Sequence, residues 1–577
     1  MALSAELRNR ARRLALENAL QHGGAPRPGP IVSRLLAQAP ELRARVPDVE
    51  RDVTDIVTEV AALTREAQAE ALAALGGAEP APARTEAAES GSLPPLPGAE
   101  RGKVVLRMAP FPSGALHIGN ARMIFVNDYY RTLYDGRLLL VFDDTVGSEE
   151  KRVDLEMFDV QRRDLEIAGV RVDATYYKSD RVPRFYPWAR KVIELGQAYV
   201  CVCPATTLRE NRAKGVACPE RSQSIEASLE GWEKMLGGGY APGEAVLRLR
   251  TDIADPDPAF RDRVLFRISD LDHPRVGRKY RVWPMLEFSW AVDDPDLGVT
   301  HVLRGKDLVI EDRMEEKIWQ VLGWKGPTFI HWGLLRLREA KISKSKSYQE
   351  VRSGQYDGWA DPRTWSIASL DRRGISAEAM RRFTLSFGLS LADIEVPAET
   401  LYAENRQIID ATTERRSFVA GPTRVTVRGF PTDLREVELA NHPDRPELGT
   451  RRVPAEGDFW LARADVDRFP GAEVRLKDLV NIRLPPAPPT GTDGPVEATF
   501  VDRPNRKLPR LQWVDAAHAV PVDLLGVEGE HRLGMGEESL GRARPGERFQ
   551  FERVGFVRVE SDWVPGTTPL RVCFGHP

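Results

Sequence analysis

The chain has 577 residues, of which 42% are hydrophobic and 29% are charged, and its formal net charge at pH 7 is -3. These proportions are typical of a soluble globular protein and exclude a disordered or fibrous chain, and no apolar run is long enough to cross a bilayer. A chain of this length exceeds a single hydrophobic core, so we expect roughly three to five domains. The near-neutral total neither requires nor excludes nucleic-acid binding, because a basic groove can lie within it.

Residues 1–75 predict a small helical domain, because Ile56, Val57, Val60 and Leu63 recur at helical spacing. This segment lacks the apolar core of a signal peptide, which predicts a cytoplasmic protein. Residues 76–100 are rich in Ala, Pro, Glu and Gly and show no periodicity. That composition predicts a flexible linker.

From residue 101 the sequence alternates between apolar, strand-like runs and amphipathic, helix-like stretches. The expected elements are a strand at 104–108, a helix at 116–134, strands at 137–142 and 298–304, a helix at 308–322 and a strand at 328–335. Strands joined through a helix normally lie parallel, with a right-handed crossover. The alternation predicts an α/β doubly wound, Rossmann-like domain built from residues 101–200 and 283–345.

Residues 201–282 interrupt this alternation and are interpreted as an inserted module. Three of the four cysteines lie here, as the close pair Cys201 and Cys203 with Cys218 nearby. This spacing is typical of a zinc site, since thiolates are common zinc ligands. The alternative is a degenerate site that holds three reduced, buried thiols.

Helical patterning returns over 377–391, within a region that runs from residue 346 to 415. Residues 416–577 then change character, with short Val-, Arg- and Phe-rich runs separated by Pro, Gly and Asp. Such short runs at turn-like intervals predict an all-β region, built from barrels.

Two short stretches carry the chemistry. His117–Asn120 follows the Pro-rich turn Pro110–Gly114 at the start of an expected helix, and Lys341–Ser345 forms a basic loop after an expected strand. A helix N-terminus offers N–H groups and a partial positive charge to phosphates. A lysine on a loop can stabilise charge as it moves onto pyrophosphate. Together they predict a site for ATP whose α-phosphate is attacked.

Both stretches resemble signatures of the class I glutamyl- and glutaminyl-tRNA synthetases. Residues 107–122 resemble the first signature, and Lys341–Ser345 resembles the second, with Ile342 where methionine is usual. Further similar stretches lie at residues 142–145, 298–307, 358–363 and 372–374. The helical N-terminal segment and the all-β C-terminal half resemble the archaeal type of glutamyl-tRNA synthetase. In that layout, residues 201–282 would bind the acceptor stem, 346–415 would contact the tRNA stem and 416–577 would bind the anticodon.

The resemblance implies an ATP site shared by the two signatures. Its residues would be Pro110, Gly114, His117, Gly119, Asn120, Lys341, Ser343 and Lys344. His117, Asn120 and Lys344 would be the catalytic residues, stabilising charge on the phosphates without forming a covalent intermediate. Asn120 replaces the second histidine of the signature, and archaeal-type members commonly carry Asn there.

The resemblance also implies an amino-acid site. Arg107 would grip the substrate, Asp143 would accept its α-ammonium group, and Arg304 would face a glutamate side chain at a place where glutaminyl enzymes lack the charge. A guanidinium makes a paired contact with a carboxylate and gains much less from a neutral amide. Leu286 and Trp290 stand where bacterial relatives carry Tyr and Asn.

The residues alone leave other interpretations of these arginines open. Arg107 would pair with Asp143 or Asp144 at the surface, and Arg304 would pair with Asp307.

In the inserted module, relatives often supply a fourth zinc ligand as Cys-x-His, and here Glu220 stands in the place of the histidine.

Arginine pairs recur in the second half of the chain and are either plain surface or contacts to tRNA phosphates. They are Arg372-Arg373, Arg381-Arg382 and Arg415-Arg416. Candidates for reading splayed anticodon bases are Arg451, Arg452, Phe459, Trp460 and Trp513.

The implied function is ATP-dependent attachment of glutamate to tRNA(Glu) through a glutamyl-adenylate, with ATP and Mg²⁺ required, no membrane partner and a monomer favoured. Two alternatives stay open. A glutaminyl-tRNA synthetase would share most of these features. A non-catalytic tRNA-binding paralogue would be expected to have lost His117 or Lys344, and both are present.

Overall fold

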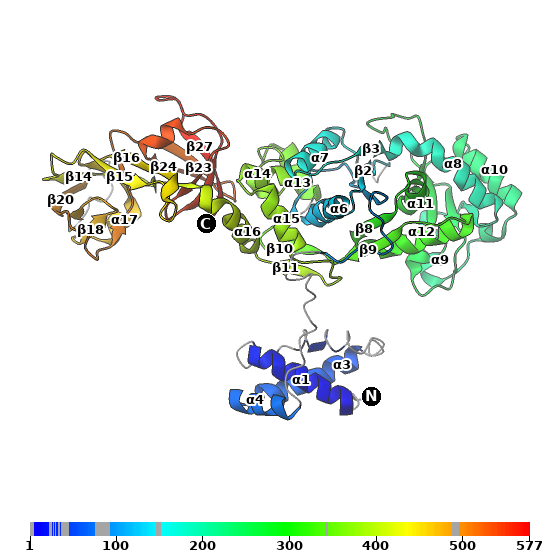
Figure 1. Ribbon diagram of the computed structural model, residues 1–577. Helices are drawn as coiled ribbons and strands as arrows, with labels where there is room; N and C mark the ends of the chain where they lie inside the picture. Colours follow the sequence, from blue (N-terminus) through cyan, green and yellow to red (C-terminus); the bar gives the residue numbers. More distant parts are fainter. Residues whose placement is uncertain are drawn as a thin grey trace. The chain divides into compact units, whose positions relative to one another are not determined.

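The computed structural model describes residues 5–21, 26, 28, 31–32, 35, 46–75, 93–145, 152–340, 344–486 and 496–577. The chain forms two compact units, residues 1–90 and 91–577, and each is described by itself (Figure 1). Within the ranges just given, no helix combines the length and apolar character that a membrane crossing would need.

The first unit contains the helices α1 (Ala5–Gln21), α3 (Val46–Ala61) and α4 (Arg65–Ala74). Leu14, Val53, Ile56 and Val60 are buried between them, as the helical spacing predicts. Thr64 caps α4 by accepting the Ala67 N–H at 3.3 Å.

The second unit begins within the segment expected to be a linker. Leu93 and Leu96 are buried, and their N–H groups donate to the hydroxyls of Tyr129 and Tyr134 at 3.1 and 3.0 Å. These contacts anchor residues 93–96 to the helix α6 (Ala121–Leu133) and to the residue that follows it. The remainder of the expected linker, residues 76–92, lies outside the described residues.

The α/β region that the resemblance predicts to be catalytic, called the catalytic region below, follows the expected alternation. Parallel strands β1 (Val105–Met108), β2 (Arg137–Phe142) and β3 (Ala174–Tyr177) lie in the order β1-β2-β3, and β8 (His301–Gly305) pairs in parallel with β9 (Thr328–Trp332). Thr300 joins the two groups, because its N–H donates to the Val105 carbonyl at 2.9 Å. The carboxyl ends of β1, β2 and β8 therefore meet at one edge, where open α/β sheets bind ligands.

Two expected elements end differently. The strand expected at 328–335 stops at Trp332, and β10 (Leu335–Leu337) pairs instead with β11 (Ile394–Val396). Gly333 lies at the break, where a Cβ would stand 2.1 Å from the Ala392 carbonyl oxygen, so only glycine fits. The helix expected at 377–391 is α15 (Ala377–Leu385), which ends before Gly388 with its positive φ of 59°.

The inserted module is an antiparallel sheet flanked by helices. Its elements are β4 (Ala198–Cys201), β5 (Val246–Leu249), β6 (Val264–Ile268), β7 (Val282–Pro284), α9 (Ala205–Lys214) and α10 (Ile225–Leu236). Trp232 and Phe266 pack edge to face in its core. On either side in sequence, α8 (Lys178–Glu194), α11 (Leu286–Asp296) and α12 (Val309–Leu322) belong to the catalytic region.

The C-terminal region contains two seven-stranded sheets. The first has the order β12 (Glu414–Arg416), β25 (Arg548–Phe551), β26 (Gly555–Val559), β27 (Leu570–His576), β23 (Val520–Leu525), β24 (His531–Gly536) and β13 (Phe418–Ala420). The second has the order β21 (Arg510–Leu511), β18 (Glu473–Leu476), β19 (Asn481–Arg483), β20 (Val496–Asp502), β14 (Pro422–Arg428), β17 (Asp458–Ala462) and β22 (Trp513–Asp515).

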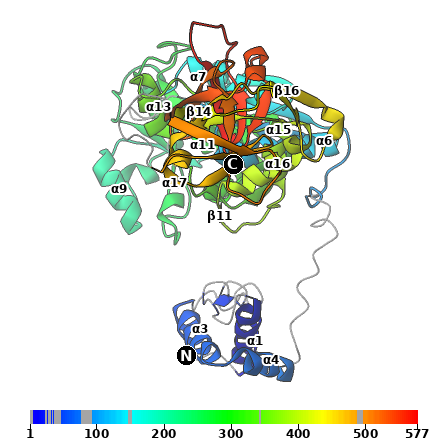
Figure 2. The ribbon, with the colours of Figure 1, turned by 90° about the vertical axis from the view of Figure 1, so that its left-hand side faces the viewer.

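Helices α14 (Ile367–Arg372) and α16 (Glu399–Ile409) join the catalytic region to the first of these sheets, and the C-terminus lies beside α16 in both views (Figures 1 and 2). Arg373 is 1% exposed and donates to the Gly575 carbonyl and the Tyr402 hydroxyl, both at 2.7 Å. Arg558 donates to Asp371 at 3.0 Å. Arg373 Nη2 therefore links α16 to the final strand β27 through two buried hydrogen bonds.

Candidate active site

Side chains of α7 (Glu156–Ile167) hold the turn of residues 110–116. Gln161 donates to the carbonyls of Phe111 and Gly114 at 3.1 and 2.7 Å, and the Leu116 N–H donates to Asp164 at 2.7 Å. Burial raises the pKa of Asp164 to about 7, against the opposing effect of the backbone N–H groups that it accepts. The turn therefore has a fixed backbone shape.

His117 and Asn120 cap each other across the short helix that follows the turn. His117 Nδ1 accepts the Gly119 N–H at 3.1 Å, and Asn120 Oδ1 accepts the His117 N–H at 3.2 Å. Because Nδ1 accepts, the neutral ring carries its proton on Nε2. Both side chains are half-buried. The imidazole is thus oriented as a donor.

The segment of residues 359–367 packs against this turn. The Ile118 N–H donates to the Trp365 carbonyl at 3.1 Å, and the Ile367 N–H donates to the Leu116 carbonyl at 2.9 Å. A Cβ at Gly114 would stand 3.3 Å from the Trp359 ring, so a side chain there would press on that ring. The first signature is consequently fixed on two sides.

The second signature is only partly described. Lys341 and Ser343 lie outside the described residues, and Lys344 begins α13 (Lys344–Arg352) without a described side chain. Further along α13, the Tyr348 hydroxyl donates to Asp154 at 2.9 Å, and the Asp154 N–H donates to the Pro112 carbonyl at 2.9 Å. The helix that Lys344 opens is therefore tied to the turn.

The three expected amino-acid-binding residues lie at the ends of different strands. Arg107 is at the end of β1, Asp143 follows β2, and Arg304 is at the end of β8. Both arginines are 5% exposed. The sheet thus brings two guanidinium groups and a carboxylate to one buried edge.

Neither arginine makes the surface ion pair that the sequence left open. Arg107 pairs with Asp294 through two hydrogen bonds of 2.5 and 2.8 Å, and not with Asp143 or Asp144. Arg304 pairs with Asp312 and donates to Glu315 at 2.8 Å, and not to Asp307. All three acidic partners of the two arginines lie on helices, Asp294 on α11 and the other two on α12.

The ring of Trp290 lies at the centre of this site. Arg107 Cζ, Lys178 Nζ and Arg304 Cζ lie 4.6, 4.8 and 4.9 Å from its centroid. Lys178 is fully buried, donates to Ser289 Oγ at 2.6 Å, and lies 3.3 Å from an Asp143 carboxylate oxygen. Sequence reasoning missed Lys178, although it directly follows β3 at the same sheet edge.

Burial controls the ionisation of this site. It raises the pKa of Glu315 to about 8 and lowers the pKa of Lys178. Arg107, Lys178 and Arg304 face the carboxyl groups of Asp294, Asp143 and Asp312. The arrangement can accept a ligand that carries both carboxylate and ammonium groups.

The cysteine cluster of the inserted module brings four potential metal ligands together. Cys201, Cys203, Cys218 and Glu220 place one ligand atom each within 4.8 Å of the others. Tetrahedral Zn²⁺ with Zn–S bonds of about 2.3 Å needs sulfur atoms about 3.8 Å apart, so this donor set fits zinc. Arg248 is buried and donates to Cys218 Sγ at 3.0 Å.

Most of the arginines that were candidates for tRNA contacts serve internal structure. Arg373 is 1% exposed, and Arg415 and Arg416 are each 8% exposed. Arg372 pairs with Glu560, and Arg381 pairs with Asp128. Arg382 is exposed and pairs with Glu378. Contact of these residues with tRNA phosphates stays a prediction, and it would require exposed pairs to exchange an acidic partner for a phosphate.

The candidates for reading anticodon bases are likewise mostly unavailable. Phe459 and Trp513 belong to the core of the second sheet, with 0% and 3% exposure. Arg451 pairs with Glu537 at 2.6 Å. Of this set, Arg452 is exposed and Trp460 is half-buried.

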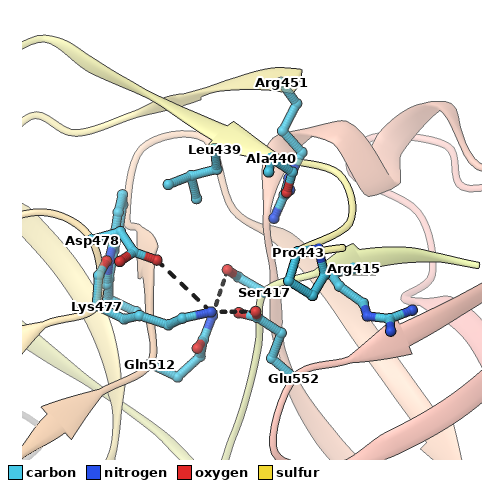
Figure 3. Close-up of a pocket in the computed structure, with 11 residues that line it drawn as sticks. Arg415, Ser417, Leu439, Ala440, Pro443, Arg451, Lys477, Asp478, Gln512 and Glu552 are labelled. Carbon is cyan, nitrogen blue, oxygen red and sulfur yellow. Dashed lines mark hydrogen bonds and ion pairs between the residues drawn. The ribbon is translucent and has the colours of Figure 1, made fainter. Parts of the chain in front are cut away.

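A polar cleft instead lies between the two C-terminal sheets (Figure 3). Its cavity of about 120 Å³ is lined by residues of both sheets, including Arg415, Lys477 and Gln512. Lys477 lies between Asp478 and Glu552. A hollow of about 460 Å³ shares Arg415, Lys477 and Gln512 and adds Arg510 and Arg553. Sequence spacing gave no signal for it, because its residues come from distant strands.

Comparison of the sequence with protein-family models assigns the chain to a family. The family described as tRNA synthetases class I (E and Q), catalytic domain, matches residues 103–410, and two anti-codon binding domain families of the same class match 413–496 and 510–560. The chain therefore belongs to the class I tRNA synthetases for glutamate and glutamine.

Individual proteins of that class match the chain over nearly its full length. Glutamate–tRNA ligases of Thermococcus kodakarensis and Pyrococcus abyssi are 39% and 37% identical to the chain, each over 96% of it and 97% of their own length. The glutamate–tRNA ligase of Methanopyrus kandleri is 38% identical over 99% of both chains. The chain thus groups with archaeal members of the family.

Proposed function

We propose that the protein attaches glutamate to tRNA(Glu) with the energy of ATP. The observation that carries this proposal is the convergence of Arg107 and Arg304, from separate strands, on one buried ring at the sheet edge that leads into the His117 turn. Two guanidinium groups suit a substrate with two carboxylates. Relatives named glutamate–tRNA ligase over nearly the full length support the same substrate.

In the first step, the α-carboxylate of glutamate attacks the α-phosphorus of ATP. A P–O bond forms to the carboxylate, the bond to pyrophosphate breaks, and glutamyl-adenylate results. His117 and Asn120 would donate hydrogen bonds to the phosphates, while Lys341, Ser343 and Lys344 would stabilise the departing pyrophosphate. Mg²⁺ that arrives with ATP would neutralise further phosphate charge.

In the second step, the terminal ribose 2′-hydroxyl of tRNA attacks the carbonyl carbon of the mixed anhydride. The ester bond to tRNA forms, the bond to AMP breaks, and the hydroxyl proton is lost. The chain contributes orientation of the reactants and a water-poor site, with Asp143 accepting the α-ammonium group of glutamate. The protein itself forms no covalent bond.

Selection of glutamate over glutamine follows from Arg304. Its guanidinium is fixed by Asp312 and Glu315, so it cannot turn away from an uncharged ligand. A carboxylate gains a charge-assisted contact there, whereas a neutral amide loses it. This favours glutamate over the glutaminyl alternative.

Binding of tRNA would involve several regions. Residues 201–282 would bind the acceptor stem, 346–415 would contact the tRNA stem, and 416–577 would bind the anticodon. The cleft that contains Lys477, Arg510 and Arg553 offers cations and amide groups at the junction of the two sheets, which suits phosphates and unpaired bases. We expect a monomer that acts in the cytoplasm.

The cysteine cluster would hold a structural zinc ion. Cys201, Cys203, Cys218 and Glu220 would be the ligands, and the bound ion would link β4 to the loop that precedes α10. The Arg248 guanidinium would offset part of the negative charge of three thiolates and a carboxylate.

The decisive test is aminoacylation of separate tRNA(Glu) and tRNA(Gln) transcripts, each with glutamate and with glutamine. We expect charging of tRNA(Glu) with glutamate. In single-turnover charging, Lys344→Ala should be about 100- to 1,000-fold slower with unchanged tRNA affinity, because it removes a cation from the transition state. Lys346→Ala, two residues along the same segment, is the matched control.

Charging with glutamine alone would support the glutaminyl alternative. No charging with either amino acid, despite tRNA binding, would support the non-catalytic alternative. Unchanged single-turnover charging in Lys344→Ala would remove Lys344 from the mechanism.

A further inference from the structure

Trp290 occupies a position in the amino-acid site that the role of the arginines does not explain. It lies on α11, is 4% exposed, and has Arg107, Lys178 and Arg304 within 5 Å of its ring centroid. A tryptophan ring is the strongest aromatic partner for a cation. The ring is therefore a surface that these three side chains share.

The indole N–H is a buried donor without a use inside the protein. Among the residues that the structure describes, Trp290 Nε1 has no hydrogen-bond partner, and the same holds for Arg304 Nη1. Arg304 Cζ lies 4.9 Å from the Trp290 centroid, so the two idle donors belong to one small region. Buried donors without partners are costly, and a bound ligand is what relieves that cost at a binding site.

A carboxylate and a carboxamide differ in how well they can satisfy these two donors. Both oxygens of a carboxylate accept hydrogen bonds, so each donor can be satisfied. A carboxamide has one accepting oxygen and one NH₂ group, and the NH₂ would face a donor. A site with two unpartnered donors therefore rejects glutamine through the second donor as well as through charge.

We propose that Trp290 is a specificity-determining residue, whose ring holds the three cations in place and whose N–H donates to the side-chain carboxylate of bound glutamate. This inference rests on the proposed function, because it names a second donor for the same substrate. Phenylalanine at this position would keep much of the ring and lose the donor. Leucine would lose both.

The experiment compares Trp290→Phe, Trp290→Leu and wild type in tRNA charging with glutamate and with glutamine. For Trp290→Phe we expect kcat/KM for glutamate to fall about 10- to 100-fold, mainly through KM, because one hydrogen bond to a charged group is lost. The preference for glutamate over glutamine should fall about tenfold or more. KM for ATP should change less than about twofold.

Trp232→Phe is the control, since Trp232 is buried in the inserted module at 1% exposure. It should lower the melting temperature without changing KM for glutamate. Trp290→Leu should lower kcat/KM for glutamate further than Trp290→Phe, because the cations lose their common surface.

The outcomes separate this inference from the function itself. Wild type that fails to charge glutamate would remove the proposed function. Wild type that charges glutamate, with a folded Trp290→Phe variant whose KM and glutamate preference stay within twofold, would overturn the role of Trp290 alone.

Discussion

The two halves of the active site are built from different interactions. The turn proposed to face ATP is held by hydrogen bonds between its backbone and the side chains of Gln161 and Asp164. The proposed amino-acid site is held by buried ion pairs of Arg107 with Asp294 and of Arg304 with Asp312. Backbone hydrogen bonds fix a shape, whereas buried ion pairs also fix a charge pattern. This contrast suits the proposed roles, in which the shape of the backbone turn positions the nucleotide and the charges of the second site select the amino acid.

The largest expected effect comes from Arg304→Gln, which breaks the charge-based half. We expect kcat/KM for glutamate to fall about 100- to 1,000-fold, because the charge-assisted contact with the substrate carboxylate is lost. The unfolding free energy should fall by about 3–5 kcal/mol, because one partner of a buried ion pair is removed. The variant leaves Asp312 and Glu315 without their cation. Steady-state charging and thermal unfolding measure the two effects.

Arg171→Gln is the control, because Arg171 is an exposed arginine paired with Asp173. It should leave kcat/KM for glutamate unchanged. An Arg304→Gln variant with normal glutamate kinetics would show that charge does not select the substrate.

Asp164→Asn tests the shape-based half and has an intermediate effect. An amide oxygen still accepts from Leu116, so we expect KM for ATP to rise about tenfold or less while KM for glutamate stays constant. Steady-state kinetics with ATP and glutamate varied separately measure this. A larger change in KM for glutamate than for ATP would contradict the division.

The pH dependence of stability sharpens the same test. Because the pKa of Asp164 is raised to about 7 in the folded state, folding retains a proton that the unfolded chain releases above about pH 4. Its contribution to stability is therefore present at low pH and is lost as the pH rises toward 7. Asp164→Asn should make the unfolding free energy less dependent on pH in this window, by the order of 2–4 kcal/mol.

The smallest expected effect on glutamate charging comes from the cysteine cluster, which lies outside both halves. Wild type should contain about one zinc per chain, and Cys203→Ala should lose it with a fall in melting temperature. KM for glutamate should change less than about twofold. Metal analysis and thermal unfolding check this, and metal-free wild type of full stability would contradict a structural zinc.

The sequence predicted the sheet edge well because its signals are local. Arg107 and Arg304 end apolar strands, and strands of one parallel sheet end together. It could not predict Asp294 or Glu315, because their partners lie 187 and 11 residues away on other elements. The sequence also carried no sign that three arginines are buried, because burial of an arginine depends on partners that only the folded chain supplies. These are Arg373, Arg415 and Arg416.

The buried joint at Arg373 has a consequence for how the chain moves. Its two hydrogen bonds, to the Tyr402 hydroxyl and the Gly575 carbonyl, last only while α16 and the final strand stay together, so bending there would break both inside a buried region. The joint therefore resists bending between the α/β region and the first C-terminal sheet.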